Sequence, residues 1–455
     1  MRITTLVLNF FERKLLSLPI ISKKNNSEIN KRIILGFFWS LFGSVISRGF
    51  TILASIIAAR ILGKVCFGEF GIIQNTFVVF SDLAGLGLGI TATKFISQYR
   101  DTDMHRVTSV FSFSIIISAI IGLIFSLIVF IFSSYIAEKI LAAPQLALSL
   151  KVGAFILFFG AINGVLTGTM LGLEAFRSIS LVNVFSGVFN SFLIIILVYY
   201  YGVLGGVIAL LTGSLILLFL NLYLIRYECP YLIKYFDIRN IFIKNDFFLS
   251  FTIPAFLAGI MFGPVNWISN TILAHQENGY SELGIFNAAN QWRMAVMFLP
   301  SVIGRIVLPL LSNTLGKSQR DYLKILKLNL LANGLATLLL SLLIALMSSQ
   351  IMNAYGSTFS SGSVVLIILV LTTIPISLND VIGQAIASQG QMWIGFSFNL
   401  AWAIVLLSSF SLLREFGALG LALSYLIAYI FHTVVQGFFV WNKLSTNKFI
   451  FYNSK

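Results

Sequence analysis

The sequence predicts an all-α integral membrane protein with about 12 transmembrane helices in two six-helix lobes, related by a pseudo-twofold axis along the membrane normal. Three observations predict this fold: an apolar composition, uncharged runs of membrane-spanning length, and an internal repeat. Of the 455 residues, 58% are hydrophobic and only 10% are charged, whereas soluble domains carry about 25% charged residues. The mean hydropathy of +0.94 therefore excludes a water-soluble globular protein.

The segment 1–32 does not have the pattern of a secretory signal peptide, which needs a basic start, an unbroken apolar core and a small-residue cleavage site. The apolar stretch from Leu6 to Leu18 is interrupted by Asn9, Glu12, Arg13 and Lys14. We expect residues 1–32 to form a cytoplasmic N-terminal arm, either as an interfacial helix or as a disordered segment.

Uncharged runs give the number of spans, because a bilayer core of about 30 Å needs roughly 20 helical residues. Five runs suit one helix each: Val107–Ala137, Val152–Leu173, Phe247–Gln276, Val381–Leu413 and Phe416–Asn442. The runs Ser178–Ile225 and Leu328–Asn379 are about twice as long as one span, so each is expected to hold two helices and a turn. Three charge-interrupted spans, at about residues 33–61, 69–97 and 282–312, complete the expected twelve.

The distribution of basic residues predicts the orientation of these spans. There are 30 basic and 16 acidic residues, a net charge of +14. With the N-terminus inside, twenty-two basic residues fall on the cytoplasmic side and five on the opposite side, namely Arg60, Lys64, Lys139, Lys151 and Arg414. Because lysine and arginine collect in cytoplasmic loops, both termini are predicted to be cytoplasmic.

An internal repeat divides the chain into halves. The segment Glu69–Ile72 matches Glu282–Ile285, and Gly202–Gly205 matches Gly417–Gly420 at nearly the same offset along the chain. Both matches fall at the same place in the helix order of each half. This predicts an N-lobe at 33–226, a cytoplasmic linker at 227–246, a C-lobe at 247–442 and a cytoplasmic tail at 443–455, with a central cleft between the lobes.

Several chemistries have no support in the sequence. Two cysteines and three histidines are too few for a disulfide framework or a Cys/His zinc cluster. The glycines at 85, 87 and 89 lie inside a predicted span with no preceding strand, so they do not form a nucleotide-binding loop. We therefore expect no enzyme activity, no catalytic residue, no metal or cofactor, and no nucleic-acid partner.

Short motifs between positions 59 and 176 resemble a known family. They are Ala59–Gly63, Glu69–Gly71, Asp82–Gly89 and Gly172–Phe176. With these segments the chain resembles the polysaccharide biosynthesis flippases of the Wzx type, in the MOP superfamily of MATE-like transporters. The resemblance implies a multi-pass protein of the bacterial inner membrane. It also implies transport of undecaprenyl pyrophosphate-linked oligosaccharide repeat units to the outer leaflet by alternating access, for O-antigen or capsule synthesis. A polysaccharide polymerase and a chain-length regulator are the further partners it implies.

Three arginines, Arg48, Arg293 and Arg305, fall inside predicted spans, where each costs about 2.5 to 3.5 kcal/mol if it faces lipid. We expect them to face the cleft and bind substrate, because the planar guanidinium donates bidentate hydrogen bonds to phosphate oxygens. Alternatives stay open for two of them. Arg48 lies at the depth of Asp82 and is expected either to pair with it or to bind substrate. Arg305 is expected to pair with Asp380, to anchor its helix at the membrane interface or to bind substrate.

Asp82 and Asp380 are the two carboxylates predicted well inside the membrane, so they are the candidates for coupling to a proton or sodium ion. For His432 a packing role is expected. Five amides are candidates for hydrogen bonds to sugars or between helices: Asn75, Asn266, Asn287, Asn290 and Gln291.

Two other functions remain as alternatives. A MATE-type multidrug or cation antiporter would share the helix count and the lobes, but intramembrane arginines favour an anionic ligand. A membrane polysaccharide polymerase or ligase would usually have a large outer loop, whereas the longest one here, roughly Ser134 to Lys151, is short.

Overall fold

The computed structural model describes residues 28–237, 261–301, 303–304, 319–389 and 391–445, and every element in them is helical. The first group of helices, which we call the first bundle, comprises α3 (Glu28–Gly85), α4 (Leu88–Tyr99), α5 (Met104–Tyr135), α6 (Ala147–Gly172), α7 (Phe176–Glu228) and α8 (Pro230–Lys234). The second bundle comprises α10 (Phe262–Ala274), α11 (Gly279–Val296), α13 (Gln319–Leu346), α14 (Ser348–Tyr355), α15 (Ser363–Ser388), α16 (Met392–Leu413) and α17 (Gly417–Ser445).

Seven helical segments in the described residues are long and apolar enough to cross a membrane. Three of them contain a turn: α3 bends at Gly63, α7 bends at Gly202, and the segment from Trp393 to Lys443 joins α16 to α17. The all-helical membrane fold is thus confirmed. The count of twelve spans stays a prediction, because residues 238–260 and 305–318 lie outside the described part of the chain.

The internal repeat is present in the backbone. Gly202 has φ 57° and ψ −137°, and its counterpart in the second half, Gly417, has φ 56° and ψ −130°. Such positive φ values favour glycine, which has no Cβ. Three positions further on, a Cβ at Gly205 would lie 1.9 Å from the carbonyl oxygen of Leu197, and one at Gly420 would lie 2.0 Å from that of Leu413. Each half of the chain therefore has the same glycine-dependent turn before its last helical segment.

The repeated glutamates also have matching roles. Glu69 accepts a hydrogen bond from Gln145 Nε2 at 2.6 Å, which ties α3 to the connection between α5 and α6. Glu282 accepts one from the backbone N–H of Ala418 at 2.9 Å, which ties α11 to the start of α17. In each half, the glutamate thus links the second helical segment to a turn, and both turns lie at the same end of the molecule.

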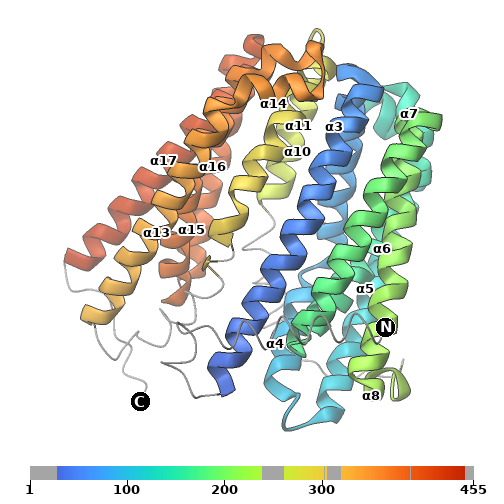
Figure 1. The fold of residues 1–455 in the computed structure, drawn as a ribbon, viewed down its shortest axis with the longest axis vertical. Coiled ribbons are helices and arrows are strands. Elements are labelled where there is room, and N and C mark those ends of the chain that lie inside the picture. Colours follow the sequence, from blue (N-terminus) through green and yellow to red (C-terminus); the bar gives the residue numbers. More distant parts are fainter. Residues whose placement is uncertain (1–27, 238–260, 302, 305–318, 390, 446–455) are drawn as a thin grey trace.

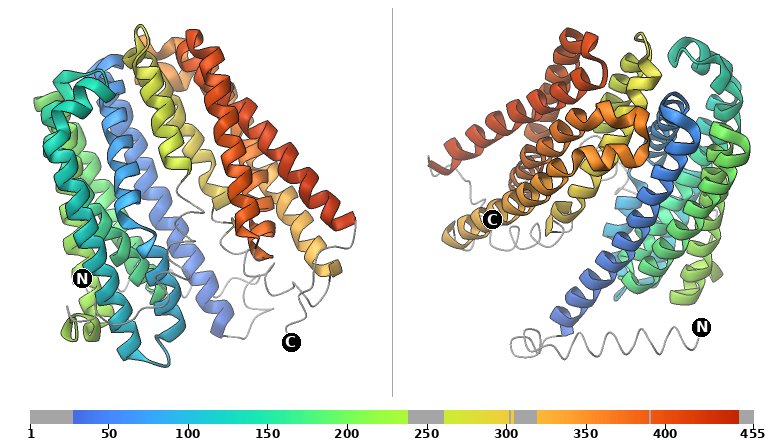
Figure 2. Two further views of the ribbon diagram at one scale, coloured as in Figure 1. Left: turned by 180° about the vertical axis from the view of Figure 1, so that it is seen from behind. Right: turned by 45° about the horizontal axis from the view of Figure 1, so that its top comes forward.

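The two bundles meet at one end and diverge toward the other (Figures 1 and 2). We call these the closed end, which contains Gly63, Gly202 and the α10–α11 turn, and the open end, where α3 begins. One hydrophobic core, which includes Phe67 and Tyr355, is shared by both bundles near the closed end. Toward the open end the core divides into one cluster within each bundle.

The closed end is sealed by aromatic rings and a glycine crossing. Phe67 packs against Tyr355 and Phe359, with ring centroids 6.3 and 5.9 Å apart, and all three rings are buried. Beside them α3 crosses α11: a Cβ on Gly68 would lie 2.0 Å from the carbonyl oxygen of Tyr280, and one on Gly284 would lie 2.0 Å from that of Lys64. Only glycines allow the two backbones to approach this closely.

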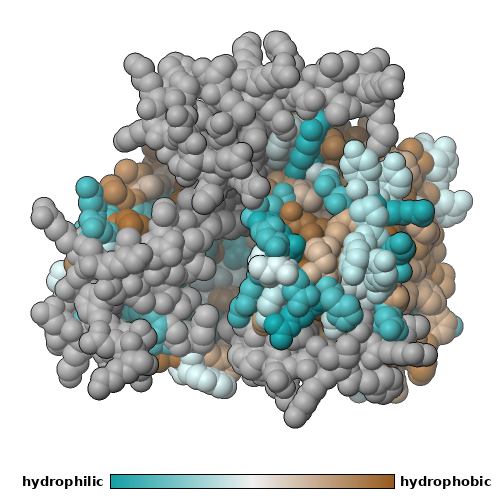
Figure 3. Space-filling model, turned by 90° about the horizontal axis from the view of Figure 1, so that it is seen from below, coloured by the Kyte–Doolittle hydropathy of each residue, from teal (hydrophilic) through white to brown (hydrophobic). Residues whose placement is uncertain are grey.

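The surface suits a bilayer. Seen from the open end, hydrophilic residues gather on the face and hydrophobic residues dominate the flank (Figure 3). Large apolar side chains are exposed along the described helices, among them Ile131, Leu339 and Leu346. In a membrane protein this apolar outer surface faces lipid.

Candidate functional site

A cavity of about 570 Å³ lies between the bundles, next to the glycine crossing on its open-end side. Its walls come from α3, α10, α11 and α17, with smaller contributions from α6 and α7. Seven side-chain amides line it, namely Gln74, Asn75, Asn266, Asn270, Asn287, Asn290 and Gln291. All five amides predicted as candidates for hydrogen bonds to sugars or between helices are in this group. A polar surface of this kind inside an apolar bundle is suited to a ligand with many hydroxyl groups.

Arg293 supplies the positive charge of this central cavity. Its side chain is buried, with only 5% exposed. Its Nε–H donates to Asn290 Oδ1 at 2.7 Å, and its guanidinium carbon lies 4.7 Å from the ring centroid of Tyr425. The N–H groups of its two terminal nitrogens have no hydrogen-bond partner in the described part of the chain, although arginine offers five donors. They are therefore able to bind an anionic group that enters the cavity.

Tyr425 connects Arg293 of α11 to Asn266 of α10. Its ring lies under the guanidinium, while its hydroxyl donates to Asn266 Oδ1 at 2.5 Å. The aromatic face attracts the cation, and the hydroxyl fixes the position of the ring. These contacts join helices α10, α11 and α17 around the charged guanidinium of Arg293.

Gln291 closes one seam between the bundles. Its Nε2 donates to Ser55 Oγ on α3 at 2.5 Å, and its Oε1 accepts from Tyr355 at 3.1 Å. At the other seam, Trp267 Nε1 of α10 donates to Thr76 Oγ1 of α3 at 2.9 Å. Both hydrogen bonds join the two bundles and break if the bundles separate.

Two amides of the cavity have unused hydrogen-bonding groups. Asn270 Oδ1 and Asn287 Nδ2 are buried without a partner in the described residues. A buried polar group without a partner costs about 1 to 3 kcal/mol. The acceptor Asn270 Oδ1 and the donor Asn287 Nδ2 are thus available to hydroxyl groups of a ligand.

Asp82, a predicted ion-coupling residue, lies on α3 where the central cavity meets a recess of about 330 Å³ walled largely by glycines. Its carboxylate has no hydrogen bond or ion pair within the described residues. Asp82 and Arg293 thus line one cavity from opposite bundles.

Arg48 lies at a seam, outside the lining of the central cavity. Its Nη1 donates to the backbone carbonyl of Met294 at 3.3 Å, and its guanidinium lies 4.9 Å from the ring centroid of Phe298. The expected pair with Asp82 is not formed between these two described residues. Matching depth is not enough for a pair, because the rotation of each helix decides where its side chains point.

Asp380 lies apart from the central cavity, in a separate chamber within the second bundle. His432, expected to pack, is buried beside the same chamber. Arg305, the third predicted substrate ligand, lies outside the described residues. Within the described chain no group of three or more His, Cys, Asp or Glu side chains is placed to hold a metal ion.

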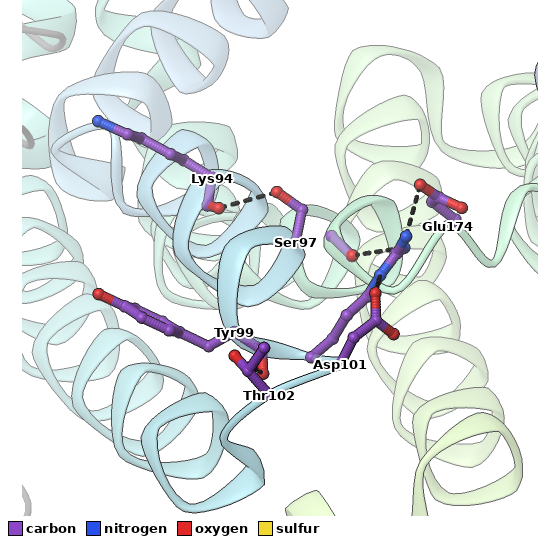
Figure 4. Close-up of polar contacts among 8 residues, drawn as sticks. Lys94, Ser97, Tyr99, Asp101, Thr102 and Glu174 are labelled. Carbon is purple, nitrogen blue, oxygen red and sulfur yellow. Dashed lines mark hydrogen bonds and ion pairs between the residues drawn. The ribbon is translucent and has the colours of Figure 1, made fainter. Parts of the chain in front are cut away.

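The Gly172–Phe176 motif has a structural role at the open end (Figure 4). Arg100, which follows α4, forms an ion pair with Glu174 at 2.7 Å and donates to the carbonyl of Gly172 at 3.3 Å. Burial lowers the pKa of Arg100, but its hydrogen bond and charge interaction with Glu174 raise it more, so the guanidinium stays charged. This ion pair fastens the end of α4 to the α6–α7 turn.

Sequence reasoning missed Gln74, Asn270 and Tyr425. A signal existed for one of the amides, because Asn266 and Asn270 are four positions apart and so lie on one face of an otherwise apolar helix. No comparable signal marks Tyr425, since a tyrosine in a membrane helix is common and its neighbour Arg293 is distant in the sequence.

The family is decided by a model that matches residues 33–315, more than half of the chain, and is described as polysaccharide biosynthesis protein. The chain belongs to this polysaccharide biosynthesis family. Relatives described as the EPS I polysaccharide export inner membrane protein EpsE are 28% identical over 181 residues in Ralstonia nicotianae and 28% over 184 residues in Ralstonia solanacearum. These alignments cover 38% and 39% of this chain, and the chain spans 41% of the length of each relative.

Solved structures show the same fold at low sequence identity. An inward-facing multidrug resistance MATE transporter of the MOP superfamily has a TM-score of 0.78 at 15% identity, with 90% of this chain and 99% of that chain covered. For an outward-facing MATE transporter the TM-score is 0.69 at 14% identity, with 93% and 97% covered. The lipid II flippase MurJ, in an inward closed conformation, has a TM-score of 0.67 at 17% identity and 90% coverage of both chains. The polysaccharide family and the MATE-like fold predicted from the sequence are thus confirmed.

Proposed function

We propose that this protein is a flippase that moves undecaprenyl pyrophosphate-linked oligosaccharide repeat units from the cytoplasmic to the outer leaflet of the inner membrane. The product serves O-antigen or capsule synthesis. The observation that carries the proposal is the buried guanidinium of Arg293, whose terminal N–H groups are unpaired in the described chain, inside a cavity with seven amides. An anionic pyrophosphate and neutral sugar hydroxyls match these two kinds of donor.

In this proposal the open end faces the cytoplasm. The support is the excess of basic residues predicted on that side, and the higher TM-score with the inward-facing than with the outward-facing MATE transporter. The headgroup enters between the bundles while the lipid tail stays in the bilayer, because stripping water from a pyrophosphate and sugars is costly in hydrocarbon.

Transport by alternating access then requires the closed end to open. The shared aromatic core and the seam hydrogen bonds of Gln291 and Trp267 would separate, while the two cores at the open end come together. The bundles, as N-lobe and C-lobe, would rock about the α3–α11 crossing.

Ion coupling is part of the same proposal. Asp82, which shares the central cavity with Arg293, and Asp380 are the proposed coupling groups for a proton or sodium ion. Arg48, at the seam, would bind substrate during entry, and a polymerase with a chain-length regulator would receive the product.

Substitution of Arg293 tests the proposal. Arg293→Ala is expected to reduce surface polysaccharide at least tenfold, because a hydrogen bond to a charged group contributes about 1.5 to 3 kcal/mol. Arg293→Lys keeps the charge but loses the planar fork, so it should retain part of the activity. The measurement is surface polysaccharide in a deletion strain complemented at equal protein levels. Wild-type activity of Arg293→Ala would remove Arg293 from the transport mechanism.

A further inference from the structure

The second bundle contains a chamber of about 510 Å³ that shares no lining residue with the central cavity. Its walls include the lower parts of α15, α16 and α17, toward the open end. The proposed function places only Asp380 here, as a coupling group for a proton or sodium ion, and gives the rest of this chamber no role. We call it the second-bundle chamber.

Hydrogen-bond acceptors without partners line the chamber. The oxygens Asn379 Oδ1, Gln384 Oε1 and Gln436 Oε1 are buried and have no hydrogen-bond partner in the described chain. Asn379 and Gln436 are only 6% and 3% exposed. The carboxylate of Asp380, an exposed residue at the same chamber, also has no hydrogen-bond partner among these residues. Several acceptors unpaired in one chamber are a costly arrangement unless a ligand brings donors.

Neighbouring contacts fix the direction of two of these oxygens, those of Asn379 and Gln436. Asn379 Nδ2 donates to the backbone carbonyl of Tyr429 at 3.4 Å, and Gln436 Nε2 donates to His432 Nε2 at 2.7 Å. The nitrogen of each amide is therefore occupied, and its oxygen is the group that stays available. The acceptors are held in place by the fold.

Aromatic faces complete the chamber. Phe262, Phe396 and Tyr429 line it together with the polar groups. Trp402 supports two of these rings from behind, with its ring centroid 4.9 Å from that of Phe262 and 5.2 Å from that of Tyr429. Rings beside directed acceptors match a sugar, which has apolar ring faces and hydroxyl donors at its edge.

The size of the chamber favours a sugar over a cation. A hard cation is bound by about six to eight oxygens at about 2.3 to 2.6 Å, which closes the site around a small volume. A chamber of about 510 Å³ holds on the order of fifteen water volumes. A ligand of several heavy-atom groups is needed to reach the acceptors on both α15 and α17.

The chamber is also within reach of the central cavity. Tyr425 lines the central cavity and Tyr429 lines the chamber, and their rings stack with centroids 6.3 Å apart. His432 lies two helical turns beyond Tyr425 on α17, which corresponds to about 10 Å along the helix. An oligosaccharide that begins near Arg293 can therefore extend into the chamber.

We infer that the second-bundle chamber is a second carbohydrate subsite, which binds the sugars farther from the pyrophosphate while Arg293 holds the charged end. This inference rests on the proposed function. It also assigns specificity for the outer sugars to Asn379, Gln384 and Gln436.

Cysteine reporters test the inference in the full-length protein, purified in a background of Cys66→Ser and Cys229→Ser. Gly383→Cys reports on the chamber, because a Cβ there meets nothing within 4 Å. Val78→Cys reports on the central cavity. Gly437→Cys is the matched control, since it also has open space around a Cβ but lines neither cavity. The readout is the rate of maleimide labelling.

The probe is the oligosaccharide still joined to its pyrophosphate and lipid, extracted from the producing strain and added in detergent. Sodium chloride is compared separately with potassium chloride at equal ionic strength. We expect the oligosaccharide to slow labelling of Gly383→Cys and Val78→Cys at least tenfold in either salt and to leave Gly437→Cys unchanged. Adding Asn379→Leu and Gln436→Leu should abolish protection of Gly383→Cys.

Three results would overturn the inference in distinguishable ways. Protection of Val78→Cys alone would reject the chamber and leave the proposed function standing. Protection of Gly383→Cys by sodium but not by oligosaccharide would make the chamber a cation site. Protection of neither reporter would reject both proposals. If Gly383→Cys fails to fold, Gly395→Cys on the α16 wall replaces it, because a Cβ there also has open space.

Discussion

At the scale of single residues, the site depends on Arg293, which is buried while its terminal N–H groups have no hydrogen-bond partner in the described residues. Asn290 and Tyr425 hold the guanidinium of Arg293 in place and leave its terminal N–H groups to the cavity. An arginine with this environment keeps its charge ready for a ligand without having to reorganise.

Tyr425 separates two contributions to this arrangement. Tyr425→Phe keeps the ring under the guanidinium and loses the hydrogen bond to Asn266, whereas Tyr425→Leu loses both. Since a desolvated cation–π contact contributes about 2 kcal/mol, we expect Tyr425→Leu to reduce surface polysaccharide roughly tenfold or more and Tyr425→Phe to reduce it less. Complementation at equal protein levels measures both. Equal losses would show that the ring face has no part in holding Arg293.

The sequence predicted part of this site. Arg293 was identifiable because a charge inside an apolar run must face protein or water. Counting along the sequence could not decide between a pair of Arg48 with Asp82 and a substrate role for Arg48. It gives the depth of a residue along a helix, whereas rotation about the helix axis depends on packing between distant segments. For the same reason the sequence did not bring Tyr425 to Arg293 or collect the amides of several helices into one cavity.

At the scale of elements, the crossing of α3 and α11 is a backbone-to-backbone contact between the bundles. Gly71 and Gly284 occupy equivalent positions in the two copies of the repeat, and both lie at this crossing. The repeat thus brings small residues from both halves to the line where the bundles meet.

Gly284→Ala tests the crossing. Its Cβ would lie 2.0 Å from the backbone carbonyl oxygen of Lys64, so the helices must move apart. Overpacking of this kind costs about 1 to 3 kcal/mol. We expect a loss of export, and increased labelling from outside intact cells of a cysteine at Ala59, which is fully buried in the shared core.

Gly437→Ala is the control, because a Cβ at that position meets nothing within 4 Å. It should retain export and leave the cysteine at Ala59 protected. If Gly284→Ala behaves like Gly437→Ala in both measurements, the crossing is not needed to seal the closed end.

At the scale of the whole molecule, one shared core at the closed end and two separate cores at the open end predict motion of the bundles as units. The sequence predicted the all-helical membrane fold and the repeat, because the spacing of apolar runs and glycine turns is local information. It did not predict which end is closed, since that depends on contacts between distant segments, such as Phe67 with Tyr355.

A reversible cross-link tests this motion. Arg60 Nε of α3 donates to the carbonyl of Ala354 at 2.6 Å at the closed end. Joining Arg60→Cys to Ala354→Cys with a reducible cross-linker should stop export, and reduction should restore it. The matched control joins Thr337→Cys to Ser377→Cys within the second bundle, where the two hydroxyls are 3.0 Å apart. Export that continues with the closed end cross-linked would contradict alternating access.

The most direct test of the central claim is to delete the gene and extract the lipid-linked intermediates. If the protein is the flippase, complete repeat units should accumulate on their lipid carrier in the inner leaflet while surface polysaccharide disappears, and not even a single unit should reach the outer leaflet. The last observation separates a flippase defect from a polymerase defect. Unchanged surface polysaccharide together with altered drug sensitivity would contradict the account and indicate a MATE-type exporter.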